Sequence, residues 1–140
     1  MRSVYDAIKT VLGIAPIAQA ASEVLSAAID TAGYNSGLVE VMVGAATGTP
    51  DSYSVACKVT ECATSGGSYA DVSGATATLT VNGTHAQIRV EGLGTSRMRY
   101  LKISMTPAFV NGTTPKALVG ATALLGRAFS EPVGNSATAA

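Results

Sequence analysis

The amino-acid sequence predicts an all-β fold, a jelly-roll-like β-sandwich of about eight strands. Val, Ile and Thr, whose branched side chains favour strands, make up 36 of the 140 residues. Runs in which apolar and polar residues alternate recur along the chain, separated by clusters of Gly, Pro, Asn and Ser. The chain also has the length of one domain, so we expect all its strands to share one core.

The first residues carry a helical pattern instead. One apolar stripe at helical spacing consists of Val4, Ile8, Val11 and Leu12. Ser3 and Asp6 have the spacing of an N-terminal cap, and Gly13 and Pro16 end the pattern. We therefore predict a short helical arm over residues 1–16, which we expect to serve attachment more than folding.

An alternative interpretation of the same region is a secretory signal peptide. Arg2 precedes an apolar run, and Ala18-Gln19-Ala20 resembles a cleavage site. Asp6, Gly13 and Pro16 count against it, because they interrupt a short apolar core. No run approaches the roughly 18 apolar residues of a membrane span, so we expect no membrane partner.

After the arm we predict the β-sandwich domain over residues 17–133, followed by a flexible C-terminal tail at 134–140 that is rich in small and polar residues. The strand candidates are residues 23–29, 38–44, 53–60, 68–72, 76–81, 86–90, 97–106 and 117–125. Eight strands in two layers fit a jelly roll.

Two of these segments carry additional signals. Asn82-Gly83 lies between two alternating runs, which predicts a β-hairpin of residues 76–81 with 86–90. Residues 117–125 are apolar on both faces, as is typical of a central or covered strand.

The composition excludes several classes of function. Nine basic residues balance nine acidic ones, and charged residues make only 13% of the chain, which argues against a nucleic-acid partner. There is no Trp and there are only seven aromatic residues, which leaves little for stacking on sugars or bases. Alanine supplies 24 of the 66 hydrophobic residues, so the core is thin and we expect support from neighbouring copies in a dimer or trimer.

Residues that carry chemistry are few. His85 is the only imidazole and falls on the predicted solvent face of the hairpin, so we expect an exposed residue and no catalytic triad. Cys57 and Cys62 on one strand would lie on opposite faces about 16 Å apart, too far for a disulfide unless the chain bends near Cys62. We interpret Cys57 as a small core residue. We expect no enzyme, no metal and no cofactor.

The distribution of charge suggests a contact with another protein. Residues 1–71 hold seven acids and three bases, whereas residues 72–140 hold two acids and six bases. The bases near residue 100 either make such a contact or form a solvated strand edge. Leu38 and Met42 point away from the valines of residues 39–43 and are expected to be exposed. The predicted contact residues are Val4, Ile8, Leu12, Leu38, Met42, Arg97, Arg99 and Lys102.

Three stretches of the chain carry a likeness to a known family: Ala28-Ile29-Asp30-Thr31-Ala32-Gly33-Tyr34-Asn35-Ser36 leading into residues 39–44, Arg99-Tyr100-Leu101-Lys102-Ile103, and Leu124-Leu125-Gly126-Arg127-Ala128. They resemble stretches of small head decoration (cement) proteins of tailed phages. The resemblance covers roughly residues 22–133. It implies a β-sandwich on the outside of the capsid, bound where major capsid proteins meet, without catalysis or cofactor. On this ground residues 23–29, whose alanines suit a helix equally well, are taken as a strand.

The expected function is therefore that of a virion protein. It is made in the cytoplasm of a bacterial host, binds the outer capsid surface and stabilises contacts between major capsid proteins. One alternative is a secreted adhesin or carbohydrate-binding β-sandwich, which requires a real signal peptide and an aromatic platform. Another is a different virion part, such as a tail or head-fibre module.

Overall fold

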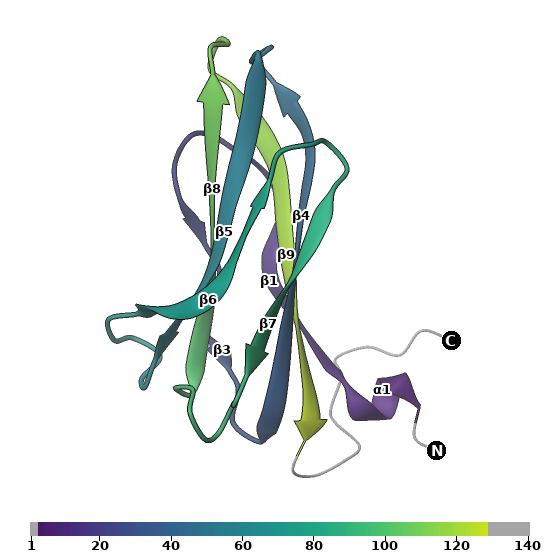
Figure 1. Ribbon diagram of the computed structural model, residues 1–140, viewed down its shortest axis with the longest axis vertical. Coiled ribbons are helices and arrows are strands. Elements are labelled where there is room, and N and C mark those ends of the chain that lie inside the picture. Colours follow the sequence, from purple (N-terminus) through teal and green to yellow (C-terminus); the bar gives the residue numbers. More distant parts are fainter. Residues whose placement is uncertain (1–2, 129–140) are drawn as a thin grey trace.

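Nearly all of the regular secondary structure in the computed structural model, which describes residues 3–128, is strand (Figure 1). The predicted tail at 134–140 lies outside the described residues, as does the end of the predicted sandwich domain. In chain order the elements are α1 (Val4–Ala7), β1 (Lys9–Gln19), β2 (Val24–Leu25), β3 (Ile29–Asp30), β4 (Tyr34–Thr47), β5 (Ser52–Cys62), β6 (Ala70–Leu79), β7 (His85–Glu91), β8 (Tyr100–Val110) and β9 (Lys116–Ala128).

The strands form two antiparallel sheets that wrap as a jelly roll. The first sheet has the order β1-β9-β4-β7, and the second has the order β2-β8-β5-β6, with β3 also paired to β8. With β2 and β3 counted as one interrupted strand, the first strand pairs with the last, the second with the next to last, and so on inward. This nested pairing is that of an eight-stranded jelly roll. The predicted fold class is confirmed.

The core lies between the inner faces of the two sheets, where β-branched and small side chains alternate with outward-facing residues. The first sheet contributes the valines of β4 and the alanines of β9, and the second contributes Val55 and Val59 of β5 and Leu101, Ile103 and Met105 of β8. Cys57 is buried among them, as predicted. Cys62 is also buried, but outside this core, because β5 stays in register with β8 through Cys62 and keeps its side chain on the opposite face, as predicted; there its sulfur lies 3.9 Å from the Thr64 hydroxyl of the following loop.

The N-terminal helix is much shorter than predicted. Ser3 does cap α1, since its hydroxyl accepts a hydrogen bond from the Asp6 N–H at 3.2 Å. From Lys9 onward, however, the chain is an edge strand paired with β9, and the prediction of helix there is wrong. An isolated helix of a dozen residues is marginal in water, whereas pairing with β9 satisfies the backbone and buries Ile14 to 4% exposure. Residues 9–16 therefore belong to the sandwich.

The predicted hairpin at Asn82-Gly83 is also wrong. Strand β6 pairs with β5 in the second sheet and β7 pairs with β4 in the first, so the turn joins the two layers (Figure 1). The turn is held by β4, since the Gly83 N–H donates to the Val43 carbonyl and the Val43 N–H donates to the Thr84 carbonyl, both at 3.0 Å. Asn-Gly favours a tight turn locally, but the strand that each arm pairs with depends on the whole fold.

Residues 23–29 are strand in type but are interrupted. Ser26 lies between β2 and β3 and stays bonded to β8: its N–H donates to the Ile103 carbonyl, and its hydroxyl accepts from the Ile103 N–H, both at 2.9 Å. A side-chain oxygen thus replaces one backbone partner of the ladder, and β2 and β3 continue along the same edge of the second sheet.

The position of β1 in the sandwich makes a prediction about stability. We expect Ile14→Ala to lower the free energy of unfolding by about 2–4 kcal/mol, because it empties a buried site. Val4, in α1, is 74% exposed, and we expect Val4→Ala to change stability by about 0.5 kcal/mol or less. Urea unfolding followed by circular dichroism measures both. Equal small losses would show that residues 9–16 are a dispensable arm after all.

Candidate interaction surface

The outer face of the first sheet carries large apolar side chains that no other part of residues 3–128 covers. Leu12 of β1 is 66% exposed, Met42 of β4 is 41% exposed, and Leu118 of β9 is 46% exposed. These side chains point outward because neighbouring residues of a strand point to opposite faces, and the residues next to them in β1 and β4 point into the core. Leu38, half-buried, lies directly opposite Leu124 on the same face. The structure thus brings together three of the predicted contact residues, Leu12, Leu38 and Met42.

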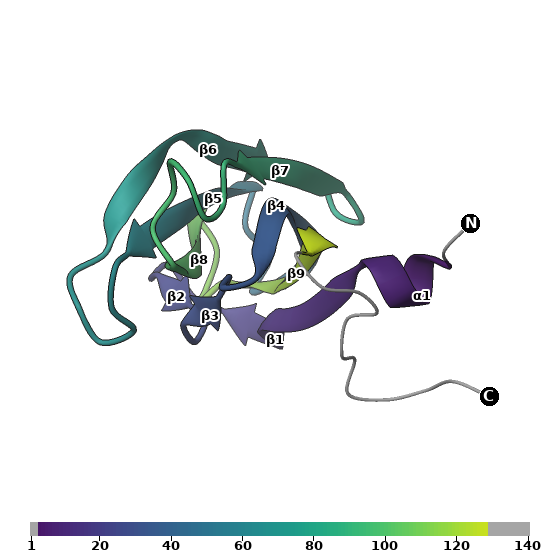
Figure 2. The same ribbon diagram turned by 90° about the horizontal axis from the view of Figure 1, so that it is seen from below.

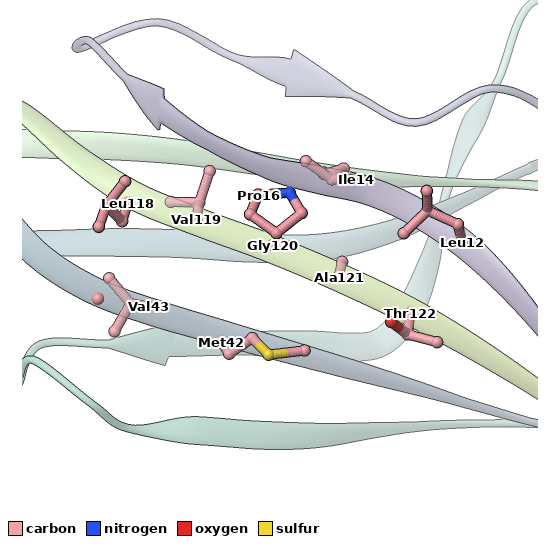
Figure 3. A pocket seen from close by; sticks show the side chains of 11 residues that line it. Leu12, Ile14, Pro16, Met42, Val43, Leu118, Val119, Gly120, Ala121 and Thr122 are labelled. Carbon is pink, nitrogen blue, oxygen red and sulfur yellow. The ribbon is translucent and has the colours of Figure 1, made fainter.

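A groove of about 350 Å³ opens in the middle of this face (Figure 3). Leu12 and Pro16 of β1 form one side, Met42 of β4 forms the other, and Leu118 lies at one end. Gly120 of β9 is the floor, and a Cβ built on it would meet no atom closer than 3.6 Å. The groove therefore exists because Gly120 has no side chain and no other side chain of the described residues fills the space above it.

The polar groups around the groove are few, and several are paired. Glu40 lies one row from Met42 on β4, and its carboxylate contacts Nδ1 of His85 on β7. The His85 side chain is 64% exposed, so the prediction of an exposed residue is confirmed. At the end of the same face, the Ser36 hydroxyl donates to the Glu91 carboxylate at 3.1 Å. Apart from Glu40 and Thr122, which lie side by side on β4 and β9, the middle of the face is apolar.

The two remaining apolar candidates lie in the N-terminal segment. Val4 is on α1, which projects from the body beside β1 and the end of β9 (Figure 2). Ile8 is the C-cap of this helix and is half-buried. Tyr5 next to Val4 is 46% exposed. The segment thus forms a second apolar area, separate from the groove.

The three basic candidates lie elsewhere, before and within β8 of the second sheet. Arg99 forms a bidentate pair with Asp30, with both nitrogen–oxygen distances at 2.8 Å. Arg97 lies 3.4 Å from Glu61, and the Lys102 ammonium lies 4.6 Å from the ring centre of Tyr69. Arg97 and Arg99, from the basic half of the sequence, are thus paired with acids of the acidic half within one chain. The structure does not bring these residues to the groove.

The pair with Arg99 changes the ionisation of Asp30. The hydrogen bond from the guanidinium is the main reason that the pKa of Asp30 falls from 3.8 to about 2, and the Ala32 N–H adds to it. The same pair raises the pKa of Arg99. The ion pair links the end of β3 to the residue before β8, at the end of the second sheet where these two strands pair.

The described residues contain no cluster of three or more His, Cys, Asp or Glu that could hold a metal ion. Both cysteines are free thiols, and burial raises the pKa of Cys57 to about 11, which makes this thiol a poor nucleophile. Within residues 3–128 no helix has the length and apolarity to cross a membrane.

Of the residues that line the groove, the sequence analysis predicted Leu12 and Met42 but missed Pro16, Leu118 and Gly120. A signal for them was present in residues 117–125, whose apolar character on both faces predicted a central or covered strand. Strand β9 is central, between β1 and β4. Its outer face, with a glycine between Leu118 and Leu124, is the face that remains uncovered within the described chain.

The ion pair at the end of the second sheet makes a prediction about pH. We expect Arg99→Gln to raise the pKa of Asp30 from about 2 toward 3.8, as measured by NMR titration of the carboxyl carbon. Because folding lowers this pKa, the pair stabilises the protein above about pH 4, and its contribution disappears as the pH falls toward 2. Arg97→Gln is the control and should leave the pKa of Asp30 unchanged. An unchanged pKa in Arg99→Gln would contradict the assignment.

No protein-family model matches the chain, and a search of curated proteins finds no match. Solved structures give distant likenesses. A chain from the disulfide-linked pili of Bacillus endospore appendages is 12% identical over 89% of this chain and 91% of that chain, with a TM-score of 0.42. A chain from Desmodium yellow mottle tymovirus is 10% identical over 98% and 95%, with a TM-score of 0.36. A family two carbohydrate esterase from Cellvibrio japonicus is 6% identical over 94% of this chain and 36% of that chain, with a TM-score of 0.35. Likenesses this distant carry no argument about function, and the fold assignment rests on the strand order.

Proposed function

We propose that this chain is a structural virion protein that decorates the outside of an icosahedral phage head and stabilises contacts between major capsid proteins. It acts by binding and not by catalysis. In this proposal it is made in the cytoplasm of the bacterial host and joins the head after the shell has assembled, without a cofactor or nucleic-acid partner.

The observation that carries the proposal is the uncovered apolar surface of the first sheet and of α1. Side chains such as Val4, Leu12 and Leu118 are 74%, 66% and 46% exposed, on a rigid sandwich whose described residues show no metal cluster. Contiguous exposed apolar residues mark contacts with other macromolecules. The few charged groups are largely used within the chain, which favours close packing against a protein surface over binding to a phosphate backbone.

A decoration protein works by mass action. A protein that binds only the assembled shell stabilises the shell by about RT ln(1 + [L]/Kd) per site, where [L] is its free concentration. Each contact can be weak, because many equivalent sites on one head add their contributions. A sandwich with paired charges and a packed core suits this role, since it binds without unfolding or rearranging.

The segment that we assign to the capsid is α1. Residues 9–16 cannot be removed without loss of an edge strand, so the attachment role expected for the whole region narrows to the residues before Lys9. Val4 and Tyr5 are 74% and 46% exposed on α1, which projects from the body (Figure 2).

The test is co-sedimentation of the purified protein with heads of its phage that lack decoration. We expect saturable migration with the heads at a fixed ratio to the major capsid protein. Val4→Asp should weaken attachment at least about tenfold, since it places a carboxylate in an apolar contact. Val81→Asp, at a valine that is 59% exposed near the turn between β6 and β7, is the matched control and should bind normally.

Thermal unfolding of both variants checks that the fold is intact. Protein that stays at the top of the gradient with heads present would contradict the proposal. If that protein instead bound glycans as a monomer, it would be an adhesin or carbohydrate-binding module.

A further inference from the structure

We propose that the outer face of the first sheet binds the same face of a second copy of this chain. The two copies are related by a two-fold axis that runs parallel to β4 and β9 and passes between them. This inference rests on the pattern of side chains on the face and is independent of the assignment to a phage head.

The pattern consists of four rows across β4 and β9. Three rows are cross-strand pairs: Leu38 with Leu124, Glu40 with Thr122, and Met42 with Gly120. In the fourth row Gly44 lies beside Leu118, since a Cβ on Gly44 would be 3.0 Å from Cβ of Leu118. A two-fold axis between the strands places each member of a row opposite the other member of the same row in the partner.

Size is complementary in the row of Met42. Met42 faces Gly120 of the partner subunit and enters the groove that Gly120 leaves open. Gly44 is covered by Leu118 of its own chain, since a Cβ on Gly44 would lie 3.4 Å from Cδ1 of Leu118. In a further row Leu38 packs on Leu124 of the partner subunit. Because the axis is two-fold, every one of these contacts is made twice.

Polarity is complementary as well. The hydroxyl of Thr122 faces Glu40 of the partner subunit and can donate a hydrogen bond to its carboxylate. The other simple arrangement has the axis perpendicular to the strands along this row. That arrangement brings the two Glu40 carboxylates together, which is unfavourable in an apolar interface. Of these two arrangements, the axis parallel to the strands keeps the two Glu40 carboxylates apart.

The face also has the required size. Pairing of β4 with β9 extends from Tyr34 to Thr47. The three pairings of this sheet contain eight, eleven and seven residue pairs, so four strands about 4.8 Å apart, with about nine residues at about 3.3 Å each, make a face of about 19 by 30 Å. Its area of roughly 570 Å² is near the lower end of specific interfaces, which bury roughly 600–1,000 Å² on each partner. The strands of the two copies run in the same direction, which suits the aligned packing of twisted sheets.

The experiment is sedimentation equilibrium of the full chain from about 1 to 500 µM, which spans the affinities expected for an interface of this size. No heads are present, so the result does not depend on the proposed function. We expect the mass to rise with concentration from 14.0 kDa to twice that value.

Two pairs of variants locate the interface. Met42→Lys should raise the dimer dissociation constant at least about tenfold, because an ammonium would be buried without a partner. Met98→Lys is its control, since Met98 is 45% exposed outside the first sheet against 41% for Met42. Leu118→Lys should act like Met42→Lys, whereas Leu25→Lys on β2, at 48% exposure, should leave the dimer unchanged.

Gly120→Leu separates loss of the dimer from loss of the fold. A Cβ at this position would make only ordinary van der Waals contacts with its own chain, at 3.6 Å or more, and the rest of the side chain would occupy the groove, so thermal stability should be kept while dimerisation is lost. A wild-type protein that stays at 14.0 kDa throughout would overturn the inference. A trimer, or equal weakening by Met42→Lys and Met98→Lys, would overturn it too. Monomeric protein whose attachment to heads is abolished by Met42→Lys would assign the face to the capsid instead.

Discussion

The double pairing of β9 is the constraint on which the rest of the structure depends. This last strand lies between β1 and β4, so it holds the N-terminal edge strand and closes the first sheet. Its inner side chains are mostly small, Ala117, Ala121 and Ala123 among them, which lets the second sheet pack closely. Gly13 shows how closely, since a Cβ there would lie only 2.5 Å from Cδ1 of Ile103. A larger residue at this bulge in β1 would push the layers apart.

The same constraint explains the outer face. A central strand of a sheet with one side in water normally alternates apolar residues inward with polar residues outward. Strand β9 instead presents Leu118, Gly120 and Leu124 outward, interrupted only by Thr122, while charged side chains elsewhere, Arg99 with Asp30 and Arg97 with Glu61, are paired within the chain. A surface with few charges and a largely apolar strip is poorly suited to a free monomer. It is well suited to a protein that is covered in its assembled state.

Local patterns predicted what depends on local structure. The alternation of residues 38–44 and 53–60 correctly predicted β4 and β5, and the β-branched content predicted the fold class. Pairing partners could not be predicted in this way. Asn82-Gly83 was expected to close a hairpin, yet the wrapping of the jelly roll sends its two arms to different sheets. Likewise, Arg99 pairs with Asp30, which lies 69 residues away in the sequence. The groove over Gly120 forms only because the fold places Leu12 and Met42 on either side of it.

A dimer through the first sheet and attachment through α1 reinforce one another. With the axis between β4 and β9, β1 of one copy lies over β7 of the partner, so the two α1 segments leave from opposite edges of the dimer. Two contacts on one particle bind more tightly than either alone, because the first raises the effective concentration of the second. In the proposed assembly, weak apolar contacts at Val4 and Tyr5 of both copies would together hold the dimer on the head, whereas a monomer with one such contact would dissociate more readily.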